Sequence, residues 1–224
     1  SNSQFCKRLK TPRVEKIIVR VFELLSGQDE HVPLAYFDGK PLPIGDCSQD
    51  RDARTGHGNG RFSHGYKMHA LGDCLGRIRM FRVKPMNEAE QPVARDELAA
   101  YVPAGCVVLA DGGYDSKTLY AALAERGAFF FAPLKKNAPP GTVAARTSPA
   151  RRAAMEAWRD RPELAGRVYA LRTRIERIFS ALSCVAGGLG PLPAWVRGLE
   201  RVTRWTSAKV SLYNARVLIR RLAS

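Results

Sequence analysis

The stretch that decides the fold is Cys106–Lys117, which reads CVVLADGGYDSK. Four apolar residues, 107–110, run directly into Asp111, and two glycines follow before a second acid, Asp115. The pattern predicts a buried strand that ends in a carboxylate. Burying an unpaired carboxylate is costly, so we expect Asp111 to meet a cation or hydrogen-bond donors. Asp115 lies beside the next predicted helix and is expected to cap it rather than to catalyse.

A second strand ends in the same way, because residues 34–38 read LAYFD and finish at Asp38. Helical periodicity is predicted for residues 13–26, 150–159, 163–184 and 195–222, a hairpin for 65–85, and a long loop for 45–61. Hairpin and strand–helix–strand units together indicate an α/β fold, in which helices cover the faces of a mixed sheet.

Asp38 and Asp111 are expected at the same edge of this sheet, where reactive groups gather at the carboxyl ends of strands. Two neighbouring carboxylates repel each other unless a cation lies between them. Magnesium takes oxygen ligands of this kind, so a metal site is one interpretation. The alternative is that each acid only caps the turn after its strand.

Residues 166–183, GRVYALRTRIERIFSALS, supply a third carboxylate on a predicted helix. Tyr169, Arg172 and Glu176 stand at positions i, i+3 and i+7, which fall within a sector of about 60° at the helical period. Glu176 could therefore join the two strand-end acids. The alternative is an ordinary surface acid that pairs with Arg172 one turn earlier.

The chain of 224 residues has a formal net charge of +15. Residues 141–224 contain 16 Lys and Arg against 5 Asp and Glu, which favours a polyanionic partner, with a solvated basic surface as the alternative. The five cysteines form no Cys-x-x-Cys pair, which argues against a disulfide framework and favours a reducing compartment. The longest apolar run is too short to span a bilayer, so no membrane partner is expected.

Four segments in order resemble the catalytic domain of bacterial insertion-sequence transposases of the DDE superfamily. LAYFD is similar to the segment of the first acid, and HGYKMHAL with GRIRMFRVKPMNEAE to the following strands and their "pGNxhD"-type turn. LADGGYDS is similar to the second-acid motif, and YALRTRIE to the Tyr-x-x-Arg-x-x-x-Glu signature. The resemblance covers roughly residues 34–220.

The resemblance implies a ribonuclease H-like fold, with a mixed five-stranded central sheet flanked by helices. It implies that Asp38, Asp111 and Glu176 are catalytic and bind two Mg²⁺ ions, with Mn²⁺ as a substitute. Its reaction is metal-dependent cleavage and strand transfer of DNA at insertion-sequence ends. A non-catalytic DNA-binding protein, domesticated or decayed, and a metal-dependent nuclease without strand transfer are the competing hypotheses.

Double-stranded DNA, as transposon ends and target, is the implied partner, with a homodimer in the DNA complex as an option. The side chains expected to contact DNA are Arg172, Tyr169, Lys67, Lys135 and Lys136. Residues 34–224 are expected to form the catalytic domain with basic C-terminal helices, and residues 1–33 a helical tail of a DNA-binding region that could be truncated. The expected location is the cytoplasm, in association with the nucleoid.

Three positions depart from the family pattern. Gly39 stands where the first acid is more often followed by Ser or Thr. Ser183 stands seven residues after Glu176, where Lys is common. The "GNxhD" turn reads Met-Asn-Glu-Ala at 86–89. These departures bear on contacts with the substrate more than on the acids.

Overall fold

The computed structural model describes residues 11–45, 48–58, 60–134, 147–184 and 188–223. Its strands run in chain order as follows: β1 Leu34–Pro43, β2 Arg54–Gly58, β3 Arg61–Asp73, β4 Ile78–Pro85, β5 Val107–Leu109 and β6 Phe129–Phe131. The longer helices are α2 Pro12–Ser26, α4 Lys117–Glu125, α6 Pro149–Asp160, α7 Pro162–Ala170, α8 Thr173–Cys184 and α9 Leu199–Leu222.

The six strands form one mixed sheet, which confirms the predicted α/β class. β1 pairs antiparallel with β3 and parallel with β5, and β5 pairs parallel with β6. β2 and β4 both pair antiparallel with β3, at successive stretches of its length. The path β4-β3-β1-β5-β6 gives the five central strands of a ribonuclease H-like sheet, and β2 is an additional sixth strand.

β2 lies where the sequence predicted a loop. That prediction for residues 45–61 was wrong, since residues 54–58 pair with residues 61–65 at the start of β3. The sequence of β2 has no alternating apolar pattern, because its only buried residues are two glycines, Gly56 and Gly58. A Cβ on Gly56 would lie 2.4 Å from the carbonyl oxygen of Met86, so the strand passes close to the backbone that follows β4.

Residues 90–101, between β4 and β5, form a broken helical element. A short turn α3, Glu90–Val93, continues as a π-helical turn η1, Ala94–Leu98, and ends in a 3₁₀ turn η2, Ala99–Tyr101. Val93, Leu98 and Ala99 bury their side chains in the core. Glu97 of η1 forms ion pairs with Arg82 and Lys84 of β4, which holds this element against the sheet.

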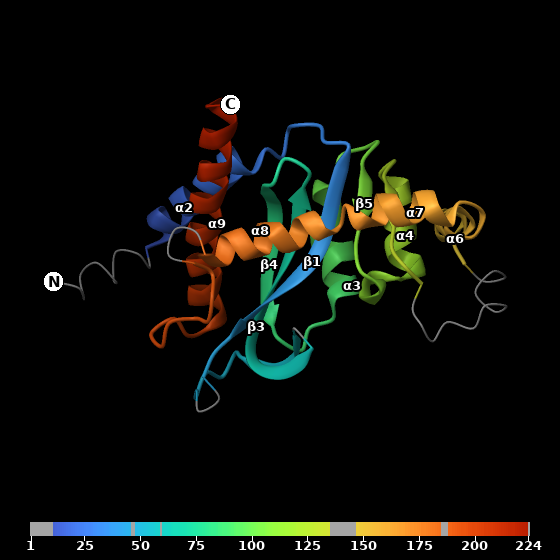
Figure 1. Ribbon diagram of the computed structural model, residues 1–224. Coiled ribbons are helices and arrows are strands. Elements are labelled where there is room, and N and C mark those ends of the chain that lie inside the picture. Colours follow the sequence, from blue (N-terminus) through green and yellow to red (C-terminus); the bar gives the residue numbers. More distant parts are fainter. Residues whose placement is uncertain (1–10, 46–47, 59, 135–146, 185–187, 224) are drawn as a thin grey trace.

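Helices from distant parts of the chain cover the sheet. α8 crosses the front of the sheet in Figure 1 and contacts β1 and β3, while α9 contacts β4. α2 packs along α9 at one side, and α4, α6 and α7 gather at the other side, where α4 and α6 contact β6. α2 therefore packs on the same body as the sheet, with the Phe22 and Phe81 rings 5.2 Å apart.

Within the described residues, no helix is long and apolar enough to span a membrane. α2 begins with Pro12 after Thr11 and ends at Gly27, whose φ of 63° is left-handed. Glycine suits this position because it takes the left-handed conformation without steric cost. The helix predicted for residues 13–26 is confirmed.

Candidate active site

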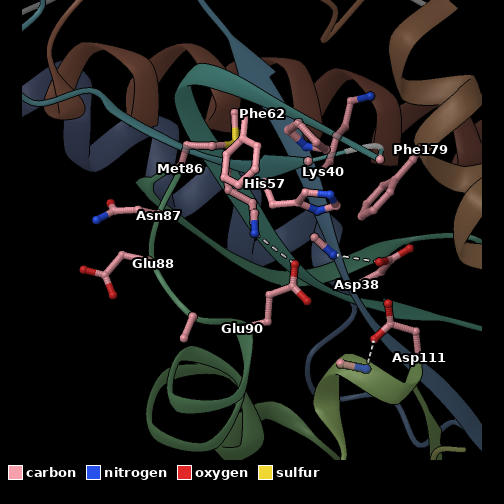
Figure 2. Close-up of a pocket in the computed structure, with 18 of the residues that line it drawn as sticks. Asp38, Lys40, His57, Phe62, Met86, Asn87, Glu88, Glu90, Asp111 and Phe179 are labelled. Atoms are coloured by element: carbon pink, nitrogen blue, oxygen red, sulfur yellow. Dashed lines mark hydrogen bonds and ion pairs between the residues drawn. The ribbon is translucent and has the colours of Figure 1, made fainter. Parts of the chain in front are cut away.

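The three predicted acids line one pocket, although they come from three distant elements. Asp38 lies in β1, Asp111 follows β5, and Glu176 lies in the first turn of α8. All three, together with Arg172, line a cavity of about 1100 Å³ at the end of the sheet. Figure 2 shows the carboxylates of Asp38 and Asp111 on neighbouring segments of this pocket.

The parallel pairing of β1 with β5 brings Asp38 and Asp111 together. Tyr36 of β1 pairs with Leu109 of β5. Two residues further along each segment, Asp38 is therefore level with Asp111. Asp38 is not at the end of its strand as predicted, because β1 continues to Pro43 against β3. β5 ends at Leu109, so Asp38 sits where β1 loses its neighbour on that side and the pocket opens.

Each of the two acids also makes the turn-capping contact considered as the alternative. Asp38 accepts a hydrogen bond of 2.8 Å from the N–H of Gly39, and Asp111 accepts one of 2.8 Å from the N–H of Gly113. These bonds leave carboxylate lone pairs free, since an ionised carboxylate has about four acceptor sites. Capping and ligand binding are therefore compatible at both residues.

The surroundings of Asp38 disfavour the ionised form of its carboxyl group. Burial raises the pKa of Asp38 to about 7, and the negative charges of Asp111 and Glu90 add to the rise. The Gly39 N–H and the Arg172 guanidinium act in the opposite direction without cancelling it. Such a carboxyl group either keeps its proton or is stabilised as a carboxylate by a nearby cation.

The predicted helix 163–184 is two helices, α7 and α8, with a break at residues 171–172. Arg172 lies at the break, and its guanidinium is 3.7 Å from Asp38 and 2.5 Å from Glu176. It also lies 5.8 Å from the centre of the Tyr169 ring. Tyr169, Arg172 and Glu176 therefore lie together, as the helical spacing predicted, even though the helix is interrupted between them.

Glu176 makes the surface contact with Arg172 that was considered as its alternative. Its side chain is 54% exposed, while that of Arg172 is 18% exposed. Among the described residues, no group of three or more His, Cys, Asp or Glu side chains is arranged to hold a metal ion. The acids thus share a pocket in which Arg172 bridges the first and the third.

The donor set nevertheless fits a hard divalent cation. Every candidate ligand in this group is a carboxylate oxygen, which magnesium and manganese prefer. The raised pKa of Asp38 is the observation that favours an additional positive charge at this point. Glu176 would reach Asp38 by exchanging its contact with Arg172.

A fourth carboxylate, Glu90 of α3, was missed in the sequence. It lines the same pocket and accepts a hydrogen bond of 3.1 Å from the ammonium of Lys67. A Cβ on Gly39 would lie 2.6 Å from Glu90 Oε1, so Glu90 occupies the space that a side chain at position 39 would need. The signal was available, because Glu90 follows Asn87 by three residues, as Asp follows Asn in the "GNxhD" pattern.

The other three residues predicted to contact DNA are Lys67, Lys135 and Lys136. Lys67 is buried at 8% exposure, where it pairs with Glu90 at the pocket wall. Lys135 and Lys136 lie outside the described residues. The hairpin of β2 and β3 forms another wall that the sequence did not indicate, with His57 and the 75% exposed Phe62 lining the pocket.

His69, two residues after Lys67, is part of the core and does not line the pocket. It is fully buried, and neither ring nitrogen has a hydrogen-bond partner among the described residues. Burial, with the charges of Lys67 and Lys84, lowers the pKa of His69 to about 3. His69 is therefore neutral in the folded protein near neutral pH.

We predict that His69 makes the protein acid-sensitive. Below pH 6.5 the unfolded chain binds a proton at this histidine and the folded chain does not, so stability falls by up to about 1.4 kcal/mol per pH unit. Above pH 6.5 the contribution is constant. Urea unfolding between pH 7 and 5 should show the wild type losing about 2 kcal/mol more than His69→Leu. Equal losses in both proteins would contradict this.

Asp115, the second acid of the opening stretch, makes a structural contact. Its carboxylate forms two hydrogen bonds with Arg151 of α6, of 2.6 and 2.7 Å, and both side chains are largely buried. This bidentate pair joins the segment after β5 to α6. Ser116 occupies the N-cap position of α4 without a side-chain cap.

Comparison with known proteins gives one family. The family model described as "Transposase DDE domain" matches residues 33–187, which include all three acids, Arg172 and Glu90. No curated protein and no solved structure matches the chain significantly. The matched range begins one residue before β1 and ends just after α8, so it covers the whole central sheet and the helix that closes the pocket.

Proposed function

Since the chain belongs to the transposase DDE domain family, we propose that it cuts DNA strands at the ends of an insertion sequence and joins the freed 3′ ends to a target. One observation carries the proposal: Asp38, Asp111 and Glu176, which are far apart in sequence, line a single pocket with Arg172. The basic excess of residues 141–224 supports a DNA substrate. A DNA substrate would place the enzyme at the nucleoid in the cytoplasm.

Asp38, Asp111 and Glu176 are the residues that would hold two Mg²⁺ ions, or Mn²⁺ in their place. Such a pair supplies stabilisation of the attacking and leaving oxygens in an in-line phosphoryl transfer. The pocket walls position the substrate around this point. No covalent intermediate with the protein is part of the proposal.

Arg172 is proposed to bind a DNA phosphate. Its guanidinium spans the carboxylates of Asp38 and Glu176. The planar guanidinium fork binds two oxygens of a phosphate as it binds those of a carboxylate, so DNA can take over this contact and leave the acids free. Tyr169, against which the guanidinium lies, would then support Arg172 or contact the DNA next to it.

The lysines play a secondary part in the proposal. Lys67 is paired with Glu90, so it would reach a phosphate by exchanging that partner. Lys135 and Lys136 remain proposed phosphate contacts. A homodimer that presents one pocket to each transposon end is the proposed assembly in the DNA complex.

A binding-only protein is the second candidate. The observation that favours it is the contact of Glu176 with Arg172, which leaves the three acids unassembled among the described residues. A protein whose acids never converge would keep DNA affinity and lose chemistry.

Incubation with duplex DNA that carries candidate terminal sequences tests the proposal. Nicks that appear with Mg²⁺ and not with EDTA support the enzyme, and joining of the freed 3′ end to a second duplex distinguishes a transposase from a nuclease. A gel shift without any nick, with Mg²⁺ and with Mn²⁺, would overturn the catalytic proposal in favour of DNA binding alone.

A further inference from the structure

Lys40 is a cation in the pocket wall that the proposed chemistry does not use. It lies two residues beyond Asp38 in β1, so both side chains project from the same face of the strand. Its ammonium donates a hydrogen bond of 2.6 Å to Ser183 Oγ at the last turn of α8. The ammonium also lies 5.9 Å from the centre of the Phe179 ring, and Figure 2 shows Lys40 and Phe179 at this end of the pocket.

The surroundings of Lys40 leave its charge uncompensated. The other two described lysines at this end of the sheet are paired, Lys67 with Glu90 and Lys84 with Glu97. Among the described residues, no carboxylate lies within ion-pair distance of Lys40, whose side chain is only partly exposed. A partly buried cation without an acidic partner is costly to the folded protein. An anion in the pocket would offset that cost.

One face of α8 connects Lys40 to the acids. Glu176, Phe179, Ser180 and Ser183 follow each other at helical spacing along this face, and all four line the pocket. From Glu176 to Ser183 the helix rises about 10 Å. The Glu176 carboxylate and the Lys40 ammonium therefore lie at opposite ends of this stretch of α8, and we call the part of the pocket beside it the groove.

We propose that Lys40 binds a backbone phosphate of the same DNA strand whose reacting phosphate lies at Asp38, Asp111 and Glu176. The inference rests on the proposed function and adds a substrate-binding residue to it. The carboxylates repel the DNA backbone, and a cation further along the strand adds to the attraction that Arg172 exerts on it. Ser183 accepts from this ammonium at the position where the family pattern commonly has a lysine, so β1 supplies the charge that α8 lacks.

Lys40→Met is the informative change, because it removes the charge and keeps the length of the side chain. In EDTA, where no cutting occurs, we expect this variant to bind a fluorescein-labelled duplex about tenfold more weakly than the wild type, as for loss of a charged hydrogen bond. The slope of log affinity against log salt should become shallower by about 0.9. Lys117→Met is the matched control, since it removes one charge from the exposed start of α4, and Lys117 does not line the pocket.

Moving the charge separates binding from packing. Ser183→Lys, added to Lys40→Met, returns an ammonium to the same end of the groove from α8 and should restore affinity and salt slope. The melting temperature of Lys40→Met should be unchanged or higher, because an unpaired charge has been removed from a partly buried place. A lower melting temperature with no rescue by Ser183→Lys would overturn the inference in favour of a packing role.

Two results separate this inference from the proposed function. If the wild type binds the duplex and Lys40→Met binds it as tightly as Lys117→Met does, Lys40 has no part in binding and only this inference falls. If the wild type itself binds no DNA, the proposed function falls and the inference with it.

Discussion

Asp111→Asn is expected to lower the rate of Mg²⁺-dependent DNA cleavage by a factor on the order of 1,000 or more. The amide cannot supply the negative charge that two-metal phosphoryl transfer requires of its ligands, and each tenfold loss of rate corresponds to about 1.4 kcal/mol of barrier. Single-turnover cleavage of a labelled duplex, with enzyme in excess, measures this effect directly.

The fold should survive this change. The bond from the Gly113 N–H goes to an oxygen of residue 111, and Asn keeps an acceptor oxygen there. The negative charge of Asp111 contributes to the raised pKa of Asp38, so its removal relieves repulsion in the pocket. We therefore expect DNA affinity equal to or above that of the wild type.

Asp160→Asn is the matched control for Asp111→Asn. Asp160 is an exposed acid at the end of α6, where it pairs with Arg159, and it is not among the residues that line the large pocket. It should cleave at the wild-type rate. Cleavage by Asp111→Asn within tenfold of that rate would remove Asp111 from the catalytic set, and the metal-dependent mechanism could not stand as proposed.

The sequence predicted the site as well as it did because strand register and helical period are local rules. Asp38 and Asp111 each follow an apolar run, and parallel pairing of those runs brings the acids level. Arg172 and Glu176 are four residues apart and meet even though the helix breaks just before them. Each of these proximities follows from one or two elements alone.

Glu90 and Lys40 escaped prediction because their roles depend on contacts between elements. Glu90 sits in an irregular turn and enters the pocket only because Gly39 leaves the space. Lys40 gains its position from a hydrogen bond to a residue 143 positions away. The strand β2 was missed for a related reason, since its buried residues are glycines and give no alternating apolar signal.

Asp73→Asn is expected to lower the free energy of unfolding by about 3–5 kcal/mol, the usual cost of breaking a buried ion pair. Asp73 is the last residue of β3 and is 1% exposed. It faces two buried arginines: Arg77 in the turn before β4, which is 2% exposed, and Arg79 in β4, which is 0% exposed. Its carboxylate accepts from the backbone and side-chain nitrogens of Arg77 at 2.9 and 3.1 Å, and Arg79 lies 3.6 Å away.

The expected loss is large because no nearby group can replace the carboxylate of Asp73. Glu30, the other acid at Arg77, is half exposed and already forms two hydrogen bonds with that guanidinium. An Asn at position 73 would turn either a neutral oxygen or an N–H donor toward Arg77, and Arg79 would be left in the core without a negative partner. The network also joins the segment after α2 to the sheet, so its loss loosens the packing of α2.

Thermal and urea unfolding measure this effect, with Asp96→Asn as the control. Asp96 forms an ion pair with Arg95 at the surface, where such pairs contribute little, so this control should unfold like the wild type. For a chain of this size, the loss at Asp73 corresponds to a melting temperature lower by about 6–20 °C. A loss of about 1 kcal/mol would lower the melting temperature of this chain by about 2 °C or more. If the melting temperatures of Asp73→Asn and Asp96→Asn differed by less than that, the two arginines would not depend on Asp73 for their burial. Glu30 would then have to be the group that keeps them in the core.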